Sequence, residues 1–87
     1  MNADEEWFVR AIEGLGAVPA KDSPYKNVWK ATGNSTVELV KFFAREFNMI
    51  PNGGGWWNHR SRDLTAQFMS YASKPGWIYI CCKPRSR

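Results

Sequence analysis

The first repeating pattern of hydrophobic positions is helical, and it lies near the N-terminus. Five apolar side chains recur at spacings that place them on one side of a helix: Trp7, Phe8, Ala11, Ile12 and Leu15. The acidic residues at positions 4–6 would lie in the first turn, where the helix dipole favours negative charge. We therefore predict an amphipathic helix over residues 4–15, followed by a proline-containing connector over residues 17–24.

A second helical pattern begins at Ser35, which is spaced from Glu38 as in a capping box. Asn48 suits the left-handed position at the end of this helix, and Pro51 prevents its continuation. The residues between them carry a wide apolar arc: Val37, Leu39, Val40, Phe42, Phe43, Ala44 and Phe47. Such an arc is too wide for a surface helix, so we predict a central core helix over residues 35–48. A turn is expected before it, at Gly33 and Asn34.

Alternating and β-branched patterns predict strands in three places. Residues 25–32 alternate imperfectly, and residues 56–60 follow the triple-glycine loop at positions 53–55. Residues 77–82 are rich in aromatic and β-branched side chains and are the clearest strand of the three. Within that strand Ile78, Ile80 and Cys82 share one face, and they are the best candidates for the core.

Residues 63–73 fit two structures. A helix with Asp63 as its N-cap would place Leu64 and Phe68 on one side, whereas a strand would align Leu64, Ala66 and Phe68. Ala, Gln and Met form helices more readily than strands, so the helix is slightly favoured.

The predicted elements indicate an α+β fold in a single compact domain over residues 1–87. We expect a small antiparallel sheet of about three strands, with two or three helices packed on one face. The helix over residues 35–48 would cover Val28, Ile78 and Ile80. Residues 83–87 are expected to form a frayed basic tail.

Composition narrows the class of protein. The hydrophobic share of 44% excludes a fully disordered chain, and no apolar run approaches the roughly 20 residues of a membrane-spanning helix. Two cysteines and one histidine cannot complete a four-ligand zinc site, so no metal or other cofactor is expected. The adjacent Cys81 and Cys82 are interpreted as reduced thiols, one buried and one near the surface, which is typical of a cytoplasmic protein.

Positive charge is concentrated in the last third of the chain. Residues 1–55 carry six Lys or Arg against seven acids, whereas residues 56–87 carry six Lys or Arg against Asp63 alone. This asymmetry favours an anionic partner for the C-terminal part.

The unusual chemistry is concentrated between Gly53 and Arg62, where flexible backbone adjoins two tryptophans and the single histidine. Aromatic rings stack on nucleobases and arginine contacts phosphate, so we predict a surface for RNA or single-stranded DNA. Trp29 and Trp77 could extend it. The predicted binding residues are Trp56, Trp57, His59, Arg60, Arg62, Lys74, Lys83, Arg85 and Arg87.

Two other functions remain open on the sequence. Tryptophan and arginine are also typical of protein–protein hot spots, so a small accessory protein or inhibitor of viral or mobile-element type could block an acidic or nucleic-acid-binding partner. A toxin-like ribonuclease could use His59 as general base, with Arg60 or Arg62 stabilising the phosphorane. The sequence has no second histidine and no acidic cluster for Mg²⁺, so a binding function without catalysis is favoured.

Overall fold

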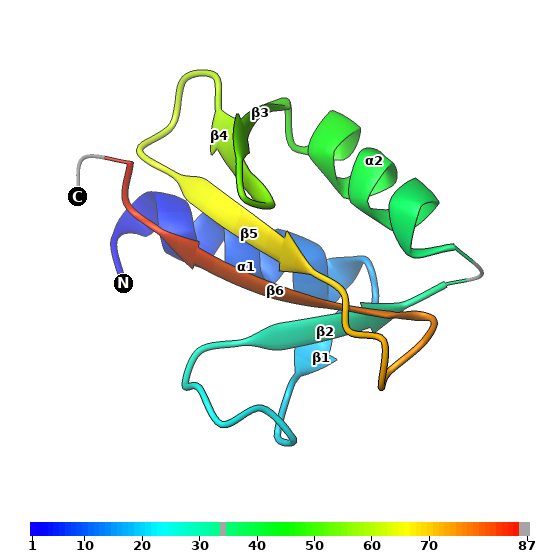
Figure 1. Ribbon diagram of the computed structural model, residues 1–87. Helices are drawn as coiled ribbons and strands as arrows, with labels where there is room; N and C mark the ends of the chain where they lie inside the picture. Colours follow the sequence, from blue (N-terminus) through cyan, green and yellow to red (C-terminus); the bar gives the residue numbers. More distant parts are fainter. Residues whose placement is uncertain (34, 86–87) are drawn as a thin grey trace.

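Six strands form one antiparallel sheet in residues 1–33 and 35–85, the part of the chain that the computed structural model describes (Figure 1). The strand order is β1-β2-β6-β5-β4-β3, and two helices complete the α+β fold. The elements are α1 (Ala3–Gly14), β1 (Val18–Pro19), β2 (Trp29–Thr32), α2 (Thr36–Glu46), β3 (Met49–Gly53), β4 (Trp56–His59), β5 (Thr65–Met69) and β6 (Trp77–Lys83). The prediction of about three strands was therefore too low.

Side-chain caps explain where both helices begin. The Asn2 side chain accepts a hydrogen bond of 2.7 Å from the Glu5 amide, and the Glu5 carboxylate accepts one of 2.9 Å from the Asn2 amide. At α2 the Ser35 hydroxyl accepts a bond of 3.3 Å from the Glu38 amide. Asn48 adopts a φ of 55° after α2, which confirms the predicted left-handed position.

The helix α2 is less central than its apolar arc predicted. It buries Phe43 and Ala44, but Val37 is 60% exposed and Phe42 is 40% exposed. One side of α2 packs on the sheet, and no element of the described residues covers the opposite side. The prediction that the whole apolar arc of this helix is buried was therefore wrong.

The predicted helix over residues 63–73 is a strand instead. β5 pairs with β4 on one side and with β6 on the other, so the sheet satisfies its backbone groups from both edges. Leu64, Ala66 and Phe68 are buried on the face turned toward the helices. Pairing with two neighbours outweighs the helix preference of Ala, Gln and Met because those preferences are small.

Other strand boundaries also differ from the prediction. β3 was not predicted, and it tolerates Pro51 because it is the edge strand of the sheet. The glycines at positions 53–55 turn the chain from β3 into β4 with positive φ angles. The strand predicted over residues 25–32 begins only at Trp29, and Asn27 before it has a φ of 58°. Val18 and Pro19 form a short strand inside the predicted connector.

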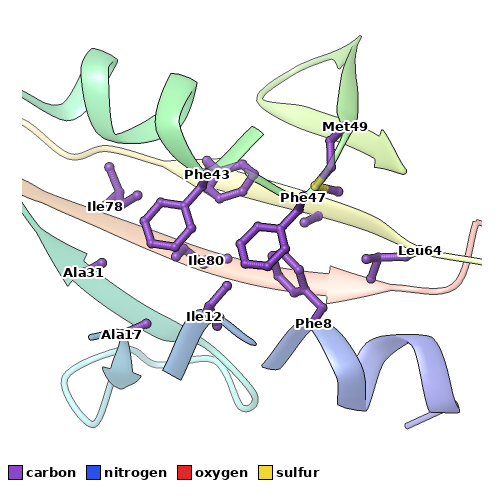
Figure 2. Packing of buried hydrophobic residues seen from close by; sticks show 12 residues of the cluster. Phe8, Ile12, Ala17, Ala31, Phe43, Phe47, Met49, Leu64, Ile78 and Ile80 are labelled. Atoms are coloured by element: carbon purple, nitrogen blue, oxygen red, sulfur yellow. The ribbon is translucent and has the colours of Figure 1, made fainter. Parts of the chain in front are cut away.

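The main core lies between the helices and one face of the sheet (Figure 2). Phe8 from α1 meets Phe47, directly after α2, edge to face with ring centroids 5.2 Å apart. Ile78 and Ile80 are fully buried beneath them, as predicted. Val28 was also expected under α2, but it lies in a second cluster with Ala20 and Tyr79.

The C-terminal segment is more ordered than the predicted tail. Lys83 belongs to β6, and the Arg85 guanidinium donates a hydrogen bond of 2.6 Å to the His59 carbonyl. The rest of that prediction, at Ser86 and Arg87, lies outside the described residues, as does the predicted turn residue Asn34.

Two neighbouring phenylalanines of α2 test this packing. Phe43→Ala should lower the free energy of unfolding by about 3–5 kcal/mol, because Phe43 is 1% exposed and its removal leaves a cavity. Phe42→Ala should cost less than half as much, because that ring is already partly in water. Urea unfolding of both variants measures the difference, and equal losses would contradict the described burial.

Candidate functional site

The face of the sheet turned away from the helices carries aromatic, amide and basic side chains. Strand alternation and register place them in rows, with Trp56 opposite Gln67 and Gln67 opposite Cys81. The next row contains Asn58, Thr65 and Lys83. We call this the open face, and its side chains are Lys30, Thr32, Ile50, Trp56, Asn58, Thr65, Gln67, Met69, Trp77, Tyr79, Cys81 and Lys83.

One end of the open face is closed by a polar network around Asp22. Its carboxylate accepts hydrogen bonds from the Tyr79 hydroxyl at 2.7 Å, from Lys30 Nζ at 3.1 Å and from Lys74 Nζ. The Lys74 ammonium, followed by Tyr79 and Lys30, holds the pKa of Asp22 well below its usual range. Tyr79 is only 3% exposed, because Tyr71 packs edge to face on its ring. Lys74, a predicted binding residue, is thus ion-paired within the protein.

The other end of the open face is accessible, and it contains three of the predicted binding residues. Lys83 Nζ lies 4.5 Å above the ring centroid of Trp56, a cation–π contact. Arg85 is held beside them through its bond to the His59 carbonyl. A hollow of about 310 Å³ opens here, and no acidic residue is among those that line it. We call this region the Trp56 site.

Arg60, another predicted binding residue, lies in the bend after β4 and does not line the hollow. It follows β4 directly, and its side chain is exposed and forms no ion pair among the described residues.

His59 and Arg62 face the opposite way, toward α1. The Arg62 guanidinium stacks 3.8 Å from the Trp7 ring centroid and forms an ion pair of 3.0 Å with Asp4. That hydrogen-bonded guanidinium holds the pKa of Asp4 below its usual value. The second Asp4 oxygen accepts a bond of 3.0 Å from the Asp63 amide. These contacts attach the loop after β4 to the first turn of α1, so Arg62 has a structural role.

The buried His59 side chain holds the same loop through hydrogen bonds with its backbone. This side chain is 6% exposed, and Nδ1 accepts backbone hydrogen bonds from Ser61 at 3.0 Å and from Arg62 at 2.9 Å. Nδ1 must be unprotonated to accept them, so the proton of the neutral ring is on Nε2. Burial, the largest influence, lowers the pKa of His59. A buried ring with an occupied lone pair does not favour the interpretation of His59 as the general base of a ribonuclease.

The predicted residues are therefore divided between two faces. Trp56, Lys83 and Arg85 lie together, but Trp57 pairs with Ala66 on the helix side and packs on the main core. Trp77 lies on the open face at its closed end, with Lys30 Nζ 4.9 Å from its ring centroid. Arg87 is outside the described residues.

Sequence reasoning missed the amides at the Trp56 site. Asn58 and Asn52 line the hollow together with Thr65. Asn58 could have been predicted from the sequence, because residues 56 and 58 share one face of a strand. Thr65 could not be found in this way while residues 63–73 were interpreted as a helix.

The two cysteines are half-buried thiols on opposite faces of β6. Burial raises the pKa of the Cys82 thiol to about 12 and also raises that of Cys81, so both are protonated near neutral pH. Protonated thiols are poor nucleophiles. Within residues 1–33 and 35–85, no three His, Cys, Asp or Glu side chains gather in a way that could hold a metal ion.

No helix among the described residues has the length and apolar character that crossing a membrane requires. Comparisons with protein-family models, with curated proteins and with solved structures found no match. The functional argument therefore rests on the geometry of the chain itself.

The buried histidine generates a pH prediction. Above a pH of about 6.5, the usual pKa of histidine, the ring is neutral in both the folded and the unfolded chain. Because the folded pKa is lowered, the free energy of unfolding should decrease as the pH falls below this value toward the folded pKa. Urea unfolding between about pH 7.5 and pH 5 measures the decrease.

His59→Asn is the matched control, since its amide oxygen can accept the same backbone hydrogen bonds but does not titrate. The variant should show a flatter profile over this range. Asp22 and Asp4 have lowered pKa values, so their contributions are present above a pH of about 4 and are lost in more acidic solution. An equally steep decrease in wild type and variant between pH 7.5 and 5 would contradict the role of His59.

Proposed function

We propose that this protein binds single-stranded nucleic acid at the Trp56 site. The observation that carries the proposal is the combination of a half-exposed indole with Lys83 and Arg85 beside a hollow whose described lining residues include no acid. An indole offers a stacking surface to any base, and the two cations are suited to the adjoining phosphates. A duplex keeps its bases stacked inside, so a flat sheet surface of this kind suits unpaired bases better.

Stacking of a base on the Trp56 indole is stronger than the contact that Lys83 makes with it. An exposed cation–π contact contributes about 0.5–1 kcal/mol, whereas stacking of one base contributes about 1–3 kcal/mol. A base can therefore displace the Lys83 ammonium from Trp56. Lys83 is exposed and forms no ion pair among the described residues, so it can then contact a phosphate.

The charge distribution supports the same end of the open face. Asp22 forms ion pairs with Lys30 and Lys74 at the closed end, and Asp4 forms one with Arg62 on the helix side. Arg60, Lys83 and Arg85 have no such carboxylate partner among the described residues. Two of these unpaired cations, Lys83 and Arg85, are thus presented at the Trp56 site.

Salt dependence tests the proposal. With three phosphate contacts, the logarithm of the binding constant should fall with the logarithm of salt concentration with a slope of about −2. Affinity should then decrease about 15-fold between roughly 50 and 200 mM salt. Fluorescence anisotropy with labelled single-stranded DNA and RNA of about ten nucleotides measures this. Lack of binding at low salt, or salt-independent binding, would contradict the proposal.

Substitution of the two open-face tryptophans locates the surface. Trp56→Leu should weaken binding roughly 5- to 150-fold, the loss of one stacked base. Trp77→Leu is the matched control, because Trp77 shares the face but lies at its closed end. The control should bind as wild type does, and circular dichroism should show that both variants are folded. Equal effects of the two substitutions would argue against the Trp56 site.

A protein partner with an acidic surface is the alternative for the same side chains. Capture from a nuclease-treated lysate separates the two, since a protein retained without nucleic acid by wild type but not by Trp56→Leu would replace the nucleic-acid proposal.

A further inference from the structure

We infer that the hollow beside Trp56 is a subsite for one purine base, which deepens the proposed function and rests on it. The hollow has a volume of about 310 Å³. This is at the lower end of the roughly 300–1,000 Å³ typical of small-ligand pockets, so it suits a single base and not a longer segment. It is lined by Asn52, Gly53, Trp56, Asn58, Thr65, Lys83 and Arg85.

The Asn58 side-chain amide is a polar group of the strand that is available to read the base. It is half-buried and forms no hydrogen bond within residues 1–33 and 35–85. Its neighbours on the open face are already engaged: the Thr65 hydroxyl donates to the Trp57 carbonyl at 3.1 Å, and the Gln67 amide donates to the Gly54 carbonyl at 3.1 Å. A half-buried amide without a partner gains more from a ligand than one already bonded.

The donor set of the hollow favours purines over pyrimidines. The side-chain amide of asparagine pairs with N6 and N7 of adenine, and its N–H group can also donate to N7 of guanine. N7 is an acceptor that both purines have and that pyrimidines lack. A purine ring also covers more of the indole than a pyrimidine does, which strengthens stacking.

The hydrogen bond from Arg85 to the His59 carbonyl sets how the nucleotide lies. It fixes one end of the guanidinium at the side of the hollow, so the remaining N–H groups are suited to phosphate. Lys83, once displaced from Trp56, adds a second cation there. The base would therefore stack on Trp56 with its N7 edge toward Asn58 and with its phosphate near Arg85.

Four thymidine oligonucleotides of about ten nucleotides test the subsite. Three carry one adenine, one guanine or one cytosine at the centre, and the fourth is all thymidine. The adenine and guanine probes should bind wild type at least about 5-fold more tightly than the cytosine and all-thymidine probes. Replacing the adenine by 7-deazaadenine, which lacks the N7 acceptor, should remove most of that preference. This second measurement needs no variant protein.

Asn58→Leu should lose the preference for purines, so that its affinities for the adenine and the all-thymidine probes become nearly equal. Wild-type binding that is equal for purine and pyrimidine probes would overturn the subsite and leave the proposed function standing. So would an undiminished preference with 7-deazaadenine or in Asn58→Leu. Absence of binding to every probe would instead overturn the proposed function itself, and the subsite with it.

Discussion

Both helices bury phenylalanine side chains against the same face of the sheet, and the arrangement of the whole molecule depends on this packing. Phe8 of α1 and Phe43 of α2 both contact Phe47, so the helices meet each other as well as the strands beneath. A small domain has apolar surface for only one substantial core. The opposite face of the sheet is consequently left to a smaller cluster around Tyr79 and to polar and basic side chains.

Charged side chains then decide which part of the open face is accessible. Asp22 gathers Lys30, Lys74 and the Tyr79 hydroxyl at one end, and this closes the surface around Trp77. Asp4 holds Arg62 against α1 on the helix side. Each acid thus forms ion pairs with nearby cations, whereas Lys83 and Arg85 at the Trp56 site form no ion pair among the described residues. Net charge alone would not have distinguished these two groups.

Predictions from the sequence were correct where an element depends on local interactions, and they failed where it depends on pairing with other segments of the chain. The predicted start of α2 was correct because Ser35 and Glu38 are three residues apart, so the cap is a local contact. The strand at β6 was correct because β-branched and aromatic residues dominate it. The helix favoured for residues 63–73 was wrong because the conformation of β5 depends on pairing with two other segments, β4 and β6. This pairing outweighs weak local preferences.

By itself the sequence determined the α+β class, the position of both helices, and the concentration of tryptophan and positive charge in the last third. Tertiary structure decided which of those residues share a surface. Trp56 and Trp57 are adjacent in sequence, but β4 directs one to the open face and the other to the core. His59 and Arg62 looked equally available for binding, and long-range contacts with α1 engaged both. Composition specifies which side chains exist, whereas pairing and packing specify the direction in which each one points.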